Sequence, residues 1–160
     1  MVIAARRCKQ KLKGISFEQK ALRILKESNI DIKNNVIIYT LEKNIYPGSL
    51  IEIEKEIKYE KELFFAIEGT KTLTLIVQKE NKTLIEKKFK NNILIKKENL
   101  SLITITCEGI EETPGVVHYI TGWFFDNDVN IEEFMSCYED TLIVVNSKDV
   151  EKVTRFMSFQ

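Results

Sequence analysis

The sequence predicts an α+β protein made of two similar units in tandem, each with helices covering one face of an antiparallel sheet. Two sequence matches support this prediction. The pair Pro47-Gly48 recurs as Pro114-Gly115, and Thr74–Val77 recurs as Thr141–Val144 at the same offset of 67 residues. Because the hydrophobic pattern around both matches also agrees, we infer one internal repeat.

The second half of the chain begins with a strand and a helix. A β-branched run at residues 102–105 predicts the strand, and a turn is expected over Glu108–Thr113. Thr113 is predicted to cap the helix and Pro114 to be its first residue, since the ring fixes φ where the amide hydrogen would be unpaired anyway. Apolar residues at three- and four-residue spacing extend this helix to Phe125.

A hairpin and a last helix complete this half. Strands are predicted at residues 129–138 and 141–145, joined by a tight connection at Glu139-Asp140. Ser147 is expected to cap the last helix. The apolar face of that helix comprises Val150, Val153 and Met157.

The first half repeats this order and adds a closing strand. Strands are predicted at residues 36–41, 63–67, 72–78 and 93–95, helices at 49–59 and 82–88, and a turn at 69–71. The inner face of the first helix comprises Leu50, Ile53 and Ile57. The order β-α-β-β-α-β is that of a ferredoxin-like unit. We expect unit 1 over residues 33–97 and unit 2 over residues 98–160, with the polar run Lys96–Asn99 as the boundary.

Residues 1–32 lie outside the repeat and predict a basic helical segment. Ser16 with Gln19 resembles a capping box, and an apolar stripe follows at Phe17, Ala21, Ile24 and Leu25. A second helix is predicted over Val2–Leu12. Residues 1–27 hold eight basic and two acidic residues, a net charge of +6. Since the whole chain has a net charge of zero, the remaining residues carry a net charge of −6.

Composition excludes several classes of protein. The 160-residue chain has 24 basic and 24 acidic residues, so no global field favours nucleic acid or a membrane surface. No apolar run approaches the roughly 20 residues that span a bilayer. Three scattered cysteines argue for a cytoplasmic location without disulfides. No nucleophile, metal cluster or cofactor loop is recognisable, and His118 is the only histidine, so we expect neither an enzyme nor a cofactor.

One turn and the strand after it resemble an ACT domain. The turn Thr113-Pro114-Gly115-Val116 is followed by a helix, by Asn130-Ile131 and by Ser136-Cys137-Tyr138. ACT domains are small ligand-binding regulatory modules, best known from aspartate kinases and other enzymes of amino-acid biosynthesis. Many carry a Pro-Gly pair and an Asn-Ile pair at these places.

The resemblance covers residues 100–158 and, less closely, residues 35–96, where Phe65-Ala66-Ile67 stands in place of Asn-Ile. The chain is similar to the paired ACT units of aspartate kinase and to short prokaryotic, chiefly archaeal, proteins. The resemblance implies a free-standing sensor without a kinase domain, which binds an amino acid and forms a homodimer.

The resemblance also implies where a ligand binds. A helix beginning at Pro114 would offer unpaired amides and a positive dipole end to a carboxylate. The implied main site comprises Ile110, Thr113, Pro114, Gly115, Val116, Asn130, Ile131 and Ser136, with a second or vestigial site at Pro47, Gly48 and Ser49. The simpler interpretation, that Thr113-Pro114-Gly115 is only a helix start, stays open.

Two other functions remain as alternatives. The basic N-terminal helices could contact nucleic acid, although no base-reading pattern is recognisable. The paired units could instead be a structural platform on which a metabolic enzyme assembles. An amino-acid sensor is the hypothesis that the resemblance favours.

Overall fold

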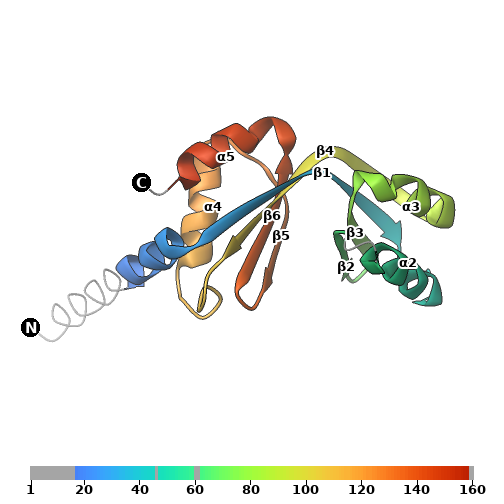
Figure 1. Ribbon diagram of the computed structural model, residues 1–160, viewed down its shortest axis with the longest axis horizontal. Helices are drawn as coiled ribbons and strands as arrows, with labels where there is room; N and C mark the ends of the chain where they lie inside the picture. Colours follow the sequence, from blue (N-terminus) through green and yellow to red (C-terminus); the bar gives the residue numbers. More distant parts are fainter. Residues whose placement is uncertain (1–16, 46, 60–61, 159–160) are drawn as a thin grey trace, which may run out of the picture. The chain divides into compact units, whose positions relative to one another are not determined.

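The computed structural model describes residues 17–45, 47–59 and 62–158, and the helix predicted over Val2–Leu12 lies outside them. The strands are β1 (Asn29–Glu42), β2 (Phe64–Glu68), β3 (Thr72–Gln78), β4 (Ile93–Thr106), β5 (Ile131–Cys137) and β6 (Asp140–Asn146). The helices are an N-terminal helix over residues 17–27, α2 (Pro47–Tyr59), α3 (Lys82–Phe89), α4 (Val116–Asp126) and α5 (Val150–Met157), with short 3₁₀ turns η1 (Lys79–Asn81) and η2 (Ser147–Asp149). The hydrogen-bonded strand order is β2-β3-β1-β4-β6-β5, and the predicted α+β, ferredoxin-like class is confirmed (Figure 1). None of the described helices is long and apolar enough to cross a bilayer.

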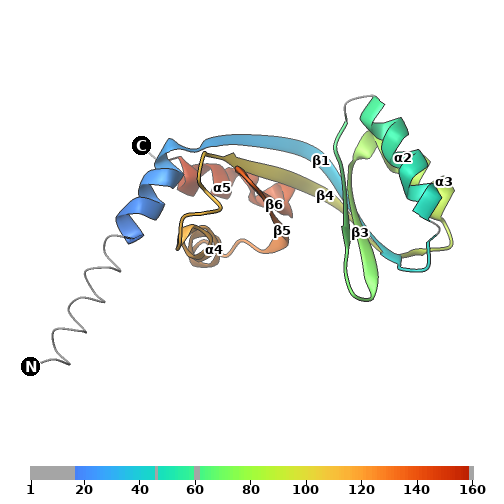
Figure 2. The ribbon, with the colours of Figure 1, turned by 90° about the horizontal axis from the view of Figure 1, so that it is seen from below.

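The chain divides into two compact units, one of which is inserted in the other. The inserted unit is Lys33–Ser101, and the flanking unit joins the residues up to Ile32 with those from Leu102 onward. Residues 17–32, the described part of the segment predicted as a separate region, therefore belong to the flanking unit. The neighbouring strands β1 and β4 both contribute to each unit (Figure 2).

The polar run Lys96–Asn99, predicted as a boundary, lies inside the continuous strand β4. Its polar side chains marked it as a connection in the sequence, but here they belong to a strand with an exposed middle. Asn99 has a φ of 58°, and Asn35 at the corresponding place in β1 has a φ of 60°. Asparagine tolerates this left-handed conformation better than most residues. Each of these two long strands thus contains one residue with a left-handed backbone conformation and continues beyond it.

The core of the inserted unit lies between its sheet and the helices α2 and α3. Its buried side chains are Ile37, Tyr39, Leu41, Ile53, Ile57, Leu73, Leu75, Val77, Ile85 and Phe89. The strand members alternate, as expected for one face of a sheet. The predicted inner face of α2 is confirmed: Ile53 and Ile57 are buried, and Leu50 packs at the edge of the core.

The core of the flanking unit includes the N-terminal helix. Its buried side chains are Ala21, Leu25, Ile103, Ile105, Ile110, Val116, Ile120, Phe124, Val129, Ile143, Val145, Val153 and Met157. Phe124 and Phe156 add an edge-to-face pair with ring centroids 5.2 Å apart. Ala21 and Leu25 come from the helix that the sequence placed outside the repeat. That helix is therefore part of a core.

The sequence repeat and the structural repeat differ by one residue in the hairpins. Leu75 and Val77 of β3 face the helices of their unit, and Ile143 and Val145 of β6 do the same in theirs, at an offset of 68. The offset of 67, at which identical residues match, would instead pair Leu75 with Leu142 and Val77 with Val144. Because side chains alternate along a strand, the members of each pair point to opposite faces of their sheets. The runs Leu75–Val77 and Leu142–Val145 are buried on both faces, so hydrophobicity alone could not reveal the shift.

The last helix begins differently from the prediction. Ser147 does not cap it. The side chain of Asn146 accepts a hydrogen bond from the Lys148 amide at 3.1 Å and so caps η2, which leads into α5. In the inserted unit the equivalent residue, Gln78, instead accepts from the Leu63 amide at 3.0 Å and leaves η1 without a side-chain cap. Val153 and Met157 are buried as predicted, and Val150 packs against the same core.

Candidate functional site

The turn before α4 is built differently from the predicted helix start. The helix begins at Val116, and Gly115 is its N-cap with a φ of 94°. Thr113 does not cap the helix, because its hydroxyl donates to the Gly109 carbonyl at 2.8 Å. Pro114 is therefore not the first helical residue. A left-handed N-cap requires glycine here, since other residues are strained at that φ.

The side chains around this turn are divided between core and solvent. Ile110 and Val116 are buried in the core of the flanking unit, and Thr113 is also buried. Pro114 and Gly115 are exposed. A ligand at this turn would thus meet Pro114, Gly115 and backbone amides, while Ile110 and Val116 hold the turn in place.

Of the residues predicted to follow α4, Asn130 and Ser136 are exposed and Ile131 is half-buried. Asn130 precedes β5 and donates through Nδ2 to Glu132 Oε1 at 3.0 Å. Ile131 packs against the core, and Ser136 is exposed near the end of β5, opposite Thr141. The resemblance implies that these residues meet the turn of a neighbouring unit. That part of the site stays a prediction.

The other Pro-Gly turn adjoins a cavity within the inserted unit. The cavity has a volume of about 150 Å³. It is lined by Lys43, Ile45, Pro47, Leu50, Glu68 and Leu73. Helix α2 begins at Pro47 itself and has no acidic residue in its first turn, so its first amides are not neutralised by a carboxylate of its own. Of the predicted residues Pro47, Gly48 and Ser49, only Pro47 lines the cavity, and the other two follow it in α2.

Strand register brings the two charged residues of this cavity together. Glu42 at the end of β1 pairs with Thr72, and Glu68 at the end of β2 pairs with Leu73. Because β1 and β2 both run antiparallel to β3, which lies between them, they end at the same end of the sheet. Lys43 Nζ therefore lies 2.9 Å from Glu68 Oε1 and also donates to the Gly69 carbonyl at 3.2 Å.

This arrangement suits a zwitterion. The Lys43 and Glu68 side chains are 45% and 66% exposed, so their ion pair is weak and open to competition from a ligand. Ile45, Leu50 and Leu73 supply an apolar wall beside them. Sequence reasoning missed Lys43 and Glu68. The signal available was a charged residue at or just after the end of each of two strands, β1 and β2, that both pair with β3.

Comparison with known proteins identifies the fold. No protein-family model and no curated protein matches the chain in sequence. The regulatory subunit of aspartate kinase from Thermus thermophilus, in its ligand-free form, matches with a TM-score of 0.66 at 14% identity, over 85% of this chain and 99% of that one. Aspartate kinase from Clostridium acetobutylicum matches with a TM-score of 0.66 at 20% identity, over 81% of this chain.

Aspartokinase III from E. coli, in complex with lysine and aspartate, matches with a TM-score of 0.57 at 14% identity, over 80% of this chain. The chain spans 33% of the Clostridium enzyme and 31% of the E. coli enzyme, against almost the whole Thermus regulatory subunit. The likeness thus covers about a third of each whole kinase. The chain has the fold of the regulatory region of aspartate kinases.

Proposed function

We propose that this chain is a non-catalytic regulatory module that binds an amino acid and transmits its occupancy to a partner. The observation that carries the proposal is the cavity beside Pro47, where a cation, an anion and an apolar wall adjoin a helix start. The fold supports it, since the similar chains include separate regulatory subunits. One similar enzyme is described in complex with lysine and aspartate.

The proposed ligand replaces the internal ion pair by its own two charges. Its carboxylate binds Lys43 and the first amides of α2, and its ammonium group binds Glu68. Its side chain lies against Leu50 and Leu73. Because an amino acid supplies both charges at once, this site discriminates against simple amines and simple acids.

The turn at Pro114-Gly115 is proposed as a second site, completed by another copy of the chain. Asn130 and Ser136 are exposed and would supply amide and hydroxyl groups to it. This arrangement requires the homodimer that the ACT resemblance implies.

A thermal-shift screen of the twenty common amino acids tests the proposal. A ligand that binds only the native state stabilises it by about 2.7 kcal/mol at one hundred times its Kd, so at least one amino acid is expected to raise the Tm. Lys43→Gln and Glu68→Gln should each abolish that rise. Lys71→Gln, an exposed lysine in the adjacent turn, serves as the matched control and should keep it. A screen without any response, or a response unchanged in both site variants, contradicts the proposal.

A further inference from the structure

A second cavity in the inserted unit lies apart from the Pro47 cavity. Its volume is about 260 Å³, and its lining comprises Asn35, Val36 and Ile37 of β1, Lys79 of η1, Lys82 of α3, and Glu98 and Asn99 of β4. The two cavities share no lining residue. Val36 and Lys43 are separated by seven residues along β1 and the turn after it, roughly 23 Å of extended chain. The larger cavity is therefore a separate candidate site.

The charges around this larger cavity favour an anion. Lys82 Nζ lies 2.9 Å from Glu98 Oε1, and Lys96 Nζ lies 3.2 Å from Glu98 Oε2. Glu98 is thus already paired with two lysines. Lys79, by contrast, has no ion pair within the described part of the chain. The lining holds two cations and one anion, which leaves one positive charge uncompensated.

The neutral polar groups of the lining are hydrogen-bond donors as well. Asn35 and Asn99 stand at equivalent places in β1 and β4, both with left-handed φ, and each carries a carboxamide. A carboxamide NH₂ donates two hydrogen bonds. Cations and donors of this kind suit the oxygens of a phosphate or carboxylate group.

The flanking unit shows that the fold itself does not require these lysines. At the structural offset of 68 residues, Lys79 corresponds to Ser147 and Lys82 to Val150. The same 3₁₀ turn and helix form there without either cation, and Asn146 caps the turn. The two lysines are therefore specific to the inserted unit, and the turn and helix can form without them.

Beside the cavity, a chain of charged groups extends to the core. Lys96 Nζ also lies 2.7 Å from Glu86 Oε1, which accepts a hydrogen bond from the buried Tyr39 hydroxyl. An anion that draws Lys82 away from Glu98 leaves Glu98 paired with Lys96. Glu98 thus keeps a partner when the cavity fills, which lowers the cost of binding.

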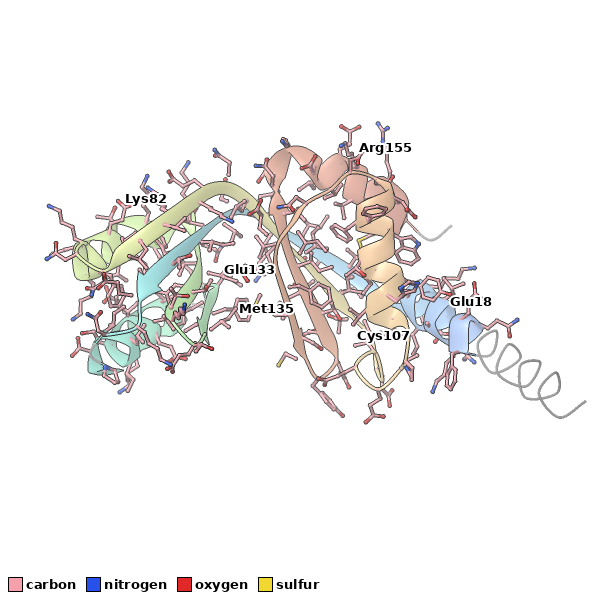
Figure 3. All side chains as sticks on the ribbon, turned by 180° about the vertical axis from the view of Figure 1, so that it is seen from behind. Glu18, Lys82, Cys107, Glu133, Met135 and Arg155 are labelled. Atoms are coloured by element: carbon pink, nitrogen blue, oxygen red, sulfur yellow. The ribbon has the colours of Figure 1, made fainter. Side chains whose placement is uncertain are left out.

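We propose that this cavity is a binding site for a small oxyanion-bearing molecule, held by Lys79 and Lys82 with the carboxamides of Asn35 and Asn99. The group bound is a phosphate or a carboxylate. This proposal does not depend on the amino acid proposed for the Pro47 cavity. Figure 3 labels Lys82, the residue that exchanges Glu98 for the ligand.

The test is titration of the ¹⁵N-labelled chain with inorganic phosphate, with succinate and, at matched ionic strength, with chloride. Phosphate or succinate should shift the amide signals of residues 35–37, 79–82 and 98–99 with saturation, and their relative affinities identify the preferred oxyanion. The variant K79Q/K82Q should weaken binding at least about tenfold, since it removes both charge-assisted contacts. Lys87→Gln, on the same helix but outside the cavity, should bind like wild type.

One further variant distinguishes binding in this cavity from binding elsewhere on the protein surface. Glu98→Gln removes the one carboxylate among the lining residues and should tighten oxyanion binding in this cavity. Non-specific attraction of anions to lysines elsewhere on the surface would not depend on this side chain. The signals followed, those of residues 35–37, 79–82 and 98–99, belong to no residue that lines the Pro47 cavity, so failure of the Pro47 proposal and failure of this one are distinguishable. Equal shifts with chloride, or K79Q/K82Q with wild-type affinity and a wild-type circular-dichroism spectrum, overturn the proposal.

Discussion

The Tyr39 hydroxyl, on the helix-facing side of β1, donates a hydrogen bond to Glu86 Oε1 of α3 across 3.2 Å. The tyrosine side chain is otherwise enclosed in the core of the inserted unit. Burial and the nearby Glu86 carboxylate both raise the pKa of Tyr39. Lys96 binds the same carboxylate at 2.7 Å, so Glu86 joins strand β1, helix α3 and strand β4. Three elements of the unit are thus linked at one carboxylate.

Tyr39→Phe is expected to lower the free energy of unfolding by about 1 kcal/mol, the usual net value of one hydrogen bond. The loss stays small because Glu86 keeps Lys96 as a partner and the ring still fills the core. Urea unfolding measures the change. Tyr59→Phe is the matched control, since Tyr59 is 85% exposed, and it should have no effect. A Tyr39→Phe variant as stable as the control contradicts the role of the bond.

The carboxylates around Lys96 should make stability depend on pH in the acidic range. The hydrogen bond from Lys96 lowers the pKa of Glu86, and hydrogen bonds from Lys82 and then Lys96 lower the pKa of Glu98, both from an ordinary value of 4.5. The folded state therefore binds protons less readily than the unfolded state. This stabilisation is present above pH 4.5 and is lost as the pH falls through the folded-state pKa values.

Urea midpoints measured between pH 7 and pH 3 check this dependence. The double variant E86Q/E98Q has no carboxylate to protonate at these positions, so its midpoint should fall less steeply with acid than that of wild type. Glu56→Gln, an exposed glutamate on α2, should retain the wild-type slope. Identical slopes in all three proteins would count against the assignment.

Two glycines near or within α4 should respond in opposite ways to alanine. Gly115 has a φ of 94°, where an L-residue is strained by about 1–2 kcal/mol, so Gly115→Ala should destabilise the chain. A Cβ at Gly122 meets no atom within 4 Å, so Gly122→Ala should stabilise the helix by up to about 1 kcal/mol. Thermal unfolding of both variants tests the pair. A Gly115→Ala variant at least as stable as wild type would refute the left-handed N-cap, and a destabilised Gly122→Ala would contradict the open space at that position of the helix.

Leu25→Ala should destabilise the chain by about 2–5 kcal/mol, since Leu25 of the N-terminal helix is fully buried in the core of the flanking unit. Lys26→Ala, one residue further along the same helix and exposed, should change stability by less than about 0.5 kcal/mol. Chemical denaturation measures both. A small effect of Leu25→Ala would show that the helix is not part of the core in solution.

The same helix decides how the nucleic-acid hypothesis is tested. Deleting residues 1–27 would also remove Ala21 and Leu25 from the core, so a variant that removes three positive charges of the helix, K20Q/R23Q/K26Q, is the sharper probe. Arg23 is already paired with Glu27 at 2.8 Å. We expect genomic DNA to be retained on filters no more by wild type than by this variant, even near 50 mM salt, where phosphate-driven binding is strong. Salt-sensitive retention by wild type alone would revive the hypothesis.

The regular elements could largely be predicted from residue patterns. The strand predicted over residues 72–78 has those bounds in the structure, and α3 and the buried face of α5 also match. Periodicity is informative because one face of each element meets a core. The ends of helices were less predictable. Thr113 and Ser147 are common N-cap residues, yet neither caps the helix predicted for it. Gly115 is the N-cap of α4, because the surrounding turn directs the Thr113 hydroxyl to Gly109. Asn146 caps the 3₁₀ turn η2 that precedes α5.

The candidate sites divide in the same way. Pro47 could be found from the sequence because the pair Pro47-Gly48 recurs as Pro114-Gly115. Lys43 and Glu68, in contrast, are far apart in sequence and meet only through the pairing of β1 and β2 with β3. Lys79, Lys82 and Glu98 likewise come together only when α3 lies beside β4. No local pattern marks these residues, because ordinary surface lysines and glutamates look the same.

By itself, the sequence determined that two α+β units repeat and which faces of their helices are apolar. These properties depend on spacing within a single element, where side-chain direction follows from backbone geometry. Tertiary structure decided that one unit is inserted in the other, that the N-terminal helix completes a core, and which charges gather around each cavity. Those properties depend on contacts between distant segments, and such contacts follow from strand register and packing rather than from local pattern.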